Sequence, residues 1–120
     1  MASIQETTVT ADRNPRYRTY PGNDTTDKIF LLSIDEANEY LNSDAERMCA
    51  PTAYAKEQGA STSGKIKVDG DASCRWWLRS PGHNQHTAAG VYGGGVLGGG
   101  YDVNYDYVCV RPAFWINLES

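Results

Sequence analysis

The sequence predicts one α+β domain, built of short antiparallel strands with two or three supporting helices. A chain of 120 residues is long enough for a single modest core and too short for two. Signals for helix starts gather between residues 33 and 59, and two aromatic-rich blocks over 75–82 and 110–118 resemble core strands. We expect the domain to span residues 28–120, preceded by an extended N-terminal arm over residues 1–27.

The N-terminal arm is polar and contains Pro15 and Pro21, with neither helical nor alternating periodicity. It is expected to be extended, with turns and one short strand near residues 8–10. The compact apolar run KIFLL at 28–32 then predicts a buried strand.

The first helix begins where Ser33 and Glu36 form a capping-box pattern, in which each side chain satisfies an otherwise unpaired backbone donor. Asn42 and Ser43 are expected to end it. The apolar face of this helix consists of Ile34, Ala37, Tyr40 and Leu41.

Two further short helices follow. Ser43 is again followed three residues later by an acidic residue, Glu46, which predicts one helical turn. The segment PTAYAKEQ at 51–58 predicts the next helix, and Gly59 is a suitable residue to end it.

A mobile hairpin arm and a core strand come next. Residues 59–71 are rich in Gly, Ser and Asp, and the alternating KIKV at 65–68 predicts a short exposed strand or hairpin arm. In the following strand, adjacent Trp76 and Trp77 point to opposite faces, so both faces are covered or one is an interface. The residues expected to form the structural frame are Trp76, Trp77, Arg79, Arg111, Phe114 and Trp115.

The segment between the two aromatic blocks, residues 83–109, has a skewed composition. It holds most of the 12 glycines and half of the eight tyrosines, but no Lys, Arg, Glu, Met, Trp or Pro. The repeat VYGGG at 91–95 and VLGGG at 96–100 predicts tight turns joining short strands, because glycine permits positive φ and weakens strand interiors.

We expect the valines of this segment, Val91, Val96 and Val103, to point inward. The remaining side chains then face outward as one candidate ligand-binding surface. Its members are His83, Asn84, His86, Tyr92, Leu97, Tyr101, Asp102, Asn104, Tyr105, Asp106 and Tyr107.

The charge of the chain argues against several functions. A net charge of -4 and a pI near 5.0 do not favour nucleic-acid binding, which relies on clustered Lys and Arg. The single basic cluster, Arg13, Arg16 and Arg18, is typical of a solvated arm. No run approaches a membrane span and the N-terminus lacks a signal-peptide pattern, so we expect a soluble chain with no direct membrane insertion.

The three cysteines, Cys49, Cys74 and Cys109, form no CxxC pair and leave at least one thiol unpaired. Buried free thiols are the favoured interpretation. His83 and His86 have no Cys or carboxylate at ligand spacing, so neither a structural metal nor a cofactor is expected.

Several motifs together resemble a bacterial and phage domain family of unknown function, DUF6273. They are WWLRSPG at 76–82, VRPAFWINL at 110–118, NDTTDKIFLLSIDEA at 23–37 and APTAYAKEQGA at 50–60, and the resemblance covers about residues 6–118. It implies a C-type lectin-like fold of the formylglycine-generating type, as in the variable proteins of diversity-generating retroelements.

Two departures from the family pattern affect the interpretation. Relatives carry further strands and a helix before the region matched here, so the resemblance implies a truncated version of the fold, completed by a partner chain or a homo-oligomer. Cys109 also occupies the position before VRPAF where glycine is usual.

The residue types of 83–109 agree with such diversification. In these retroelements, template adenines are copied to random bases, and asparagine codons AAC and AAT thereby reach many amino acids but not Lys, Glu, Gln, Met or Trp. Apart from Gln85, which would be a fixed position, the segment contains only reachable types.

Three functions remain open. The first is a non-catalytic binding module that recognises protein or glycan on a cell surface, since Tyr with Gly, Asn and His is the mixture used in antibody loops. The second is a structural or assembly domain of a phage tail or bacterial surface protein. The third is a relative of the formylglycine-generating oxidase; however, Arg111 is followed by Pro112 and not by the copper-binding cysteine of that enzyme.

Overall fold

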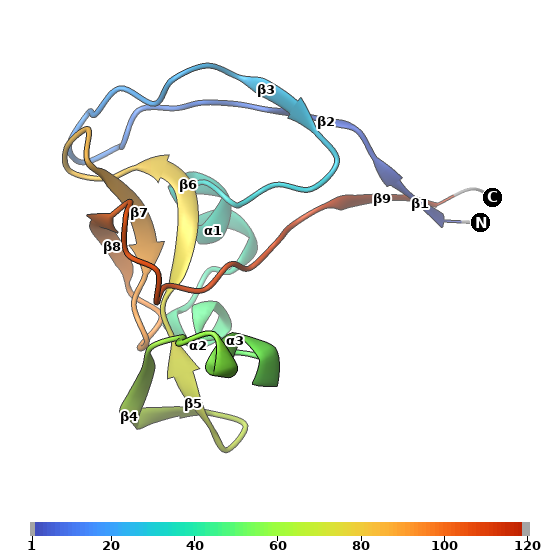
Figure 1. Cartoon of the computed structure of the whole chain (residues 1–120). Helices are drawn as coiled ribbons and strands as arrows, with labels where there is room; N and C mark the ends of the chain where they lie inside the picture. Colours follow the sequence, from blue (N-terminus) through green and yellow to red (C-terminus); the bar gives the residue numbers. More distant parts are fainter. Residues whose placement is uncertain (1, 119–120) are drawn as a thin grey trace.

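A computed structural model describes residues 2–118 of the chain, which form three helices and nine strands (Figure 1). Every paired strand is antiparallel, so the expected α+β class is confirmed. The helices are α1 (Ile34–Tyr40), α2 (Asp44–Arg47) and α3 (Ala53–Glu57). The strands are β1 (Ala2–Gln5), β2 (Thr7–Val9), β3 (Thr25–Asp27), β4 (Thr62–Val68), β5 (Asp71–Cys74), β6 (Trp76–Pro81), β7 (Thr87–Val91), β8 (Leu97–Asp102) and β9 (Trp115–Leu118).

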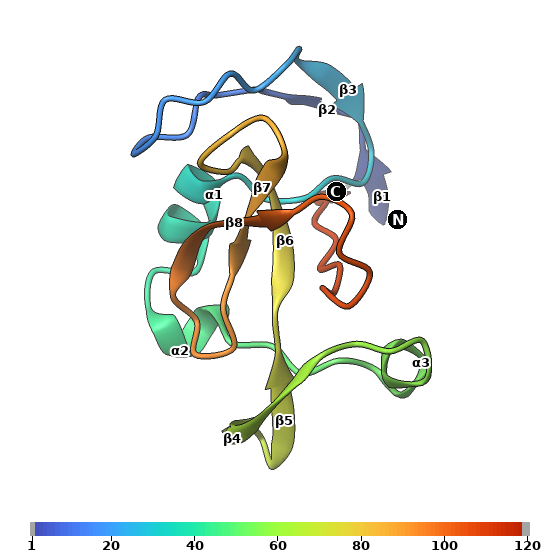
Figure 2. The same ribbon diagram turned by 60° about the vertical axis from the view of Figure 1, so that its left-hand side comes forward.

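The central sheet has the order β6-β7-β8, and three two-stranded pairs, β1-β9, β2-β3 and β4-β5, surround it (Figures 1 and 2). Burial alternates along β6, because Trp76 and Leu78 face the core while Trp77 lies on the other side. These two core side chains pack with Ala89 and Val91 of β7, and helix α1 covers them through Ala37.

The helix starts follow the sequence signals. The Ser33 side chain accepts a hydrogen bond from the Glu36 amide, and the Glu36 carboxylate accepts one from the Ser33 amide, which completes the capping box. Helix α1 ends at Tyr40, slightly before the expected Asn42. Helix α2 begins after Ser43.

The third helix is also confirmed. Thr52 caps the N-terminus of α3, and Gly59 follows its C-terminus with a φ of 96°.

The expected strand at 28–32 does not form. Only Phe30 pairs, in a single bridge with Ala113. Arg79 takes up the next two carbonyls: its guanidinium donates to Leu31 and its backbone amide donates to Leu32. Arg79 of β6 therefore satisfies the Leu31 and Leu32 carbonyls, although these residues form no strand.

The N-terminal arm is extended but anchored to the domain. It folds back as the β2-β3 pair, where the sequence predicts a strand near residues 8–10. Its turn is attached to the end of β6: the Asn14 amide donates to the Pro81 carbonyl (2.8 Å), and the Thr19 hydroxyl donates to the Gly82 carbonyl (2.6 Å). Both side chains are buried.

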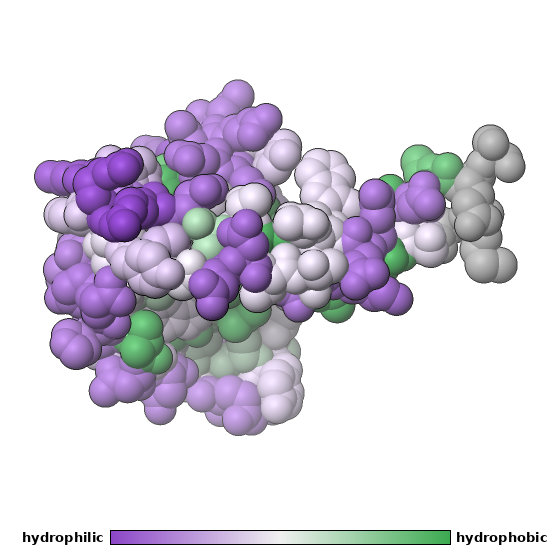
Figure 3. Space-filling view, turned by 90° about the horizontal axis from the view of Figure 1, so that it is seen from above, coloured by the Kyte–Doolittle hydropathy of each residue, from purple (hydrophilic) through white to green (hydrophobic). Residues whose placement is uncertain are grey.

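The terminal strands β1 and β9 pair with each other and project from the domain as a ribbon (Figure 1). Phe114 and Trp115, which we expect from the sequence to be buried frame residues, are both 47% exposed. That expectation is wrong, because β9 pairs with β1 alone among the described strands, and an edge-to-face contact with Tyr40 of α1 (centroids 5.7 Å apart) leaves about half of Trp115 exposed. Exposed hydrophobic residues, in green, lie among hydrophilic ones along the projecting ribbon (Figure 3).

No helix in the described part of the chain is long and apolar enough to cross a membrane.

Candidate functional site

The two faces of the central sheet are covered differently. Helix α1 covers one face. Beyond β8, residues 103–108 cross the opposite face and reach the outer edge of β6, where Cys109 pairs in parallel with Trp76 (Figure 2). The Trp77 amide donates to the Cys109 carbonyl (3.0 Å), and the Cys109 amide donates to the Arg75 carbonyl (2.8 Å).

Glycines allow aromatic rings to lie directly on this second face. Gly90 and Gly98 are cross-strand partners on β7 and β8. A Cβ on Gly90 would lie 2.5 Å from the Tyr101 ring, and a Cβ on Gly98 would lie 2.6 Å from the Tyr92 ring. Each ring therefore occupies the volume that a side chain on the sheet would need.

We call the surface formed by Trp77, Tyr92, Tyr101, Tyr105 and Tyr107 the tyrosine face. Tyr101 lies at its centre, with its ring edge-to-face against Trp77 (centroids 5.8 Å apart) and against Tyr92 (5.3 Å). The Arg75 guanidinium carbon lies 5.5 Å from the Tyr101 ring centroid. Burial raises the pKa of Tyr101 above its usual value, partly opposed by the charge of Arg75, so the phenol stays neutral.

The outer part of the tyrosine face is a stacked pair. The rings of Tyr105 and Tyr107 lie 5.0 Å apart at an interplanar angle of 26°. Tyr105 is 38% exposed, and the negative charge of Asp102, with a smaller effect from Tyr107, raises the pKa of its phenol. Tyr105 therefore offers an exposed, uncharged ring, stacked on the half-buried Tyr107 and beside a carboxylate.

The loop between β6 and β7, which we call the histidine loop, carries His83, Asn84 and His86. It lies at the end of the sheet opposite the turn between β7 and β8. The His83 Nδ1 donates a hydrogen bond to the Gly99 carbonyl (3.1 Å), and the His83 ring meets Tyr17 of the arm edge-to-face (5.9 Å). The Asn84 side chain accepts from the His86 amide (2.8 Å), and the His86 carbonyl accepts from Val103 (3.0 Å). These exposed residues continue the surface past Val103.

Most of the sequence-predicted surface residues are exposed, and the structure corrects two of them. Tyr101 is only 6% exposed, because it packs between Trp77 and Tyr92. Leu97 is half-buried against the core, because it is the direct cross-strand partner of the core residue Val91. The residues that are exposed as expected are His83, Asn84, His86, Tyr92, Asp102, Asn104, Tyr105 and Asp106, while Tyr107 is half-buried.

Of the three valines expected to point inward, only Val91 is buried. Val96 is 50% exposed because it ends the turn after β7, where its carbonyl accepts from the Tyr92 amide. Val103 is 63% exposed because β8 has already ended and the chain turns across the sheet.

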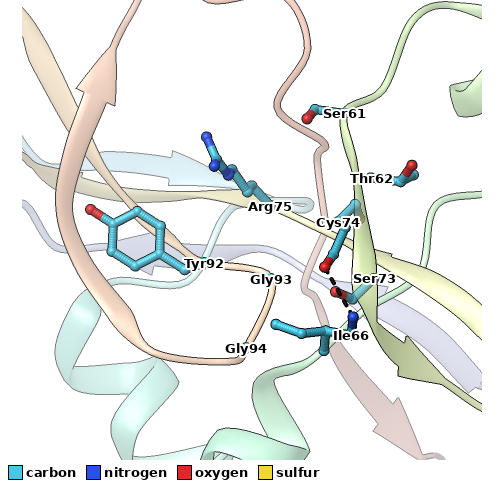
Figure 4. Close-up of a pocket in the computed structure, with 10 residues that line it drawn as sticks. Ser61, Thr62, Ile66, Ser73, Cys74, Arg75, Tyr92, Gly93 and Gly94 are labelled. Atoms are coloured by element: carbon cyan, nitrogen blue, oxygen red, sulfur yellow. Dashed lines mark hydrogen bonds between the residues drawn. The ribbon is translucent and has the colours of Figure 1, made fainter.

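A pocket of about 330 Å³ adjoins the tyrosine face, between the β4-β5 hairpin and the turn that follows β7 (Figure 4). Tyr92, Gly93 and Gly94 form one wall, and Arg75 stands at the side of Tyr92. The hairpin side of the pocket consists of Ser61, Thr62, Ser63, Ile66, Ser73 and Cys74.

The three cysteines, far apart in sequence, come together beside this pocket. Cys74 pairs with Cys49 in an antiparallel bridge, and all three thiols are free. A hydrogen bond from the Cys74 thiol lowers the pKa of Cys49 to about 6; burial opposes this shift, and the charge of Arg111 adds to it. The pKa of Cys74 is raised, by its hydrogen bond to Cys49 and then by burial and Cys109. In residues 2–118 no group of three or more His, Cys, Asp or Glu side chains is arranged to hold a metal ion.

Sequence reasoning missed Arg75 and the hydroxyl residues of the pocket. Arg75 precedes the tryptophans and carries no motif. Ser61, Thr62 and Ser63 belong to the segment predicted as a mobile hairpin arm, and Ser73 lies just beyond it. For these pocket residues the sequence held one signal, the alternation of KIKV at 65–68. This pattern predicted the hairpin but not which face of the hairpin lies toward the tyrosines.

Comparison with known proteins places the chain in a family without assigning it an activity. No curated protein and no solved structure matches it. The family described as "Domain of unknown function (DUF6273)" matches residues 1–118. This match spans nearly the whole chain, and the protein therefore belongs to the DUF6273 family.

Proposed function

We propose that the protein is a non-catalytic binding module whose tyrosine face recognises protein or glycan on a cell surface. The observation that carries the proposal is the stack of exposed Tyr105 on half-buried Tyr107, together with exposed Tyr92 packed edge-to-face on buried Tyr101. Tyrosine offers a large amphipathic contact area with few rotatable bonds. A packed base with an exposed rim is a suitable arrangement for a preorganised recognition surface.

The surroundings of the stack support recognition of a polar surface. Asp102, Asn104 and Asp106 are exposed in the same loop and supply hydrogen-bond acceptors, with the Asn side chain also a donor. Rim groups of this kind add specificity to an aromatic centre.

We further propose that the fold is C-type lectin-like and that a diversity-generating retroelement varies the exposed residues of the tyrosine face. Two observations support the proposed variation. The exposed residues of the face and its loop are all types that mutated asparagine codons reach, whereas Trp76 and Trp77 of the sheet are of a type that they do not reach. The backbone beneath is held by the cross-strand pairs of β6, β7 and β8, so exchange of exposed side chains leaves the sheet intact.

The test of diversification is the gene and its neighbouring DNA from several isolates of the source. We expect a reverse-transcriptase gene and a near-identical repeat that differs only at adenines. Amino-acid differences between copies should fall at Tyr92, Asp102, Asn104, Tyr105 and Asp106 and spare the core. Copies with identical tyrosine faces and varied cores would contradict the proposal and favour a fixed assembly interface.

The test of binding uses labelled protein on a panel of bacterial cells. The double variant Tyr105→Ser/Tyr107→Ser should lose binding to any strain that the wild-type protein labels. The control is Tyr40→Ser, which removes an exposed tyrosine from α1 on the opposite side of the sheet. Equal loss in both variants, or in neither, would show that the tyrosine face is not the recognition surface.

A further inference from the structure

The pocket beside Tyr92 contains a buried hydroxyl without a partner. Ser73 of β5 is fully buried, and its Oγ makes no hydrogen bond within the described residues. Burial of an unsatisfied hydroxyl costs about 1–3 kcal/mol, so such a group points to a ligand or an ordered solvent molecule. Ser73 lines the pocket next to Gly93, since a Cβ on Gly93 would lie 3.0 Å from the Ser73 Oγ.

Further hydrogen-bond donors line the same pocket. The Ser63 Oγ accepts from the amides of Lys65 (3.2 Å) and Ile66 (3.0 Å), which leaves its own hydrogen free to donate. The amides of Gly93 and Gly94, at the turn, donate to no backbone carbonyl in residues 2–118. The pocket is therefore rich in donors on both walls.

Arg75 adds a positive charge at the side of the pocket. Its backbone is held in place by the hydrogen bond from Cys109, and its guanidinium rests over Tyr101. In the described part of the chain no carboxylate lies within ion-pair distance of it. An arginine positioned in this way, in a chain of net charge -4, is suited to pairing with a ligand carboxylate.

Tyr92 supplies the apolar surface of the pocket. Its ring stands edge-to-face against Tyr101, which limits its rotation, and it borders the pocket beside Gly93 and Gly94 (Figure 4). A flat ring of this kind accommodates the C–H face of a pyranose. A simple phosphate or acetate would leave both this ring and most of the 330 Å³ unused.

We propose that this pocket binds the terminal acidic sugar of a glycan, with the carboxylate on Arg75, the ring hydroxyls on Ser63 and Ser73, and the C–H face on Tyr92. This inference rests on the proposed binding function, because Tyr92 belongs to both the pocket and the tyrosine face. It names the class of ligand: a uronic or sialic acid at the end of a surface polysaccharide.

The direct test is an NMR titration of the whole ¹⁵N-labelled chain with glucuronate, glucose and acetate. Glucuronate and glucose share a pyranose ring and differ in the carboxylate, and acetate has the carboxylate without the ring. We expect saturable shifts of the Ser73, Gly93 and Gly94 amides with glucuronate, and affinity about tenfold lower for glucose because the charge-assisted hydrogen bond is lost. Acetate binding as tightly as glucuronate would overturn the proposal, since it would indicate an anion site only.

Two variants with matched controls locate the binding. Arg75→Gln should reduce glucuronate affinity to that for glucose, whereas Arg13→Gln should not, although Arg13 also lies over an exposed tyrosine ring, at 5.6 Å. Gly93→Leu should fill the pocket and abolish binding of both sugars. Gly64→Leu adds the same side chain on β4, where a Cβ would meet nothing within 4 Å, and should bind normally.

The outcomes separate this inference from the proposed function. The acidic-sugar pocket is wrong if glucuronate causes no saturable shift. It is also wrong if Arg13→Gln and Gly64→Leu lose as much glucuronate binding as Arg75→Gln and Gly93→Leu. Either result would leave open the case in which Tyr105→Ser/Tyr107→Ser still abolishes cell labelling. If glucuronate binds as described and that double variant labels cells normally, the pocket stands and the tyrosine face is not the recognition surface.

Discussion

The ring of Tyr101 lies against the backbone of Gly90 across the β7-β8 pair, in the space where any other residue at position 90 would carry its Cβ. The same β8 strand contains an irregular register between the pairs Ala88–Tyr101 and Gly90–Gly98. Because one extra residue moves the following side chains to the other face of a sheet, this bulge brings Tyr101 onto the tyrosine face.

Gly90→Ala should destabilise the protein. The added methyl group meets the Tyr101 ring at 2.5 Å and the Trp76 carbonyl at 3.1 Å, and overpacking of this kind costs about 1–3 kcal/mol. Urea denaturation should show a lower midpoint with an unchanged slope. Gly64→Ala is the control, because a Cβ there meets nothing within 4 Å; equal stability of the two variants would contradict the packing.

Trp76→Ala should cost about 3–5 kcal/mol and come close to unfolding so small a domain. Trp76 is fully buried, and its indole Nε1 donates to the Arg47 carbonyl (2.9 Å). Trp115→Ala should cost less than about 1 kcal/mol, since surface substitutions rarely cost more. Thermal melting distinguishes the two, and a larger loss for Trp115 would show that β9 is buried in solution.

Tyr101→Ser and Tyr105→Ser should differ in their effect on folding. Tyr101 is buried, so its replacement by serine leaves a cavity and should lower the free energy of unfolding by about 3–5 kcal/mol. Tyr105 is exposed, so its loss should change stability by about 0.5 kcal/mol. Circular dichroism melts measure both. Equal destabilisation would mean that Tyr105 is part of the core and not of a binding surface.

Cys49 should react with iodoacetamide at unusually low pH. Its pKa is lowered to about 6, so the reactive thiolate predominates at pH 7 and its labelling rate should fall only as the pH drops through about 6. Buried Cys74, whose pKa is raised, should remain unlabelled in the folded protein and serves as the internal control. The labelling rate at each pH is measured by peptide mass spectrometry. If the rate reached half its maximum near the ordinary pKa of a thiol, the pairing of Cys49 with Cys74 would be contradicted.

The protein should self-associate through the β1-β9 ribbon. Within residues 2–118 each ribbon strand pairs with one other strand, and Ile4, Trp115, Ile116 and Leu118 are exposed along the ribbon. A second copy can therefore cover both the free edges and the apolar side chains. Sedimentation should give an oligomer that Trp115→Ser/Leu118→Ser converts to a monomer. Tyr54→Ser, an exposed substitution on α3, is the control. A monomeric wild-type protein would refute this expectation.

Local signals in the sequence predicted the helices and the hairpin well. Ser33, Ser43, Thr52 and Gly59 act within a few residues of themselves, so their patterns located the three helices almost to the residue. The apolar run at 28–32 was misassigned because the partner that satisfies its backbone, Arg79, lies far along the chain.

What the sequence by itself determined is therefore the set of elements and the composition of the exposed loop, because capping, alternation and glycine turns depend on neighbouring residues. Only the tertiary structure decided that Tyr101 and Leu97 are turned away from solvent, that Cys49 and Cys74 meet, and that Ser73 and Arg75 share a pocket with Tyr92. These outcomes depend on strand register, and a shift of one residue reverses the face that every following side chain occupies.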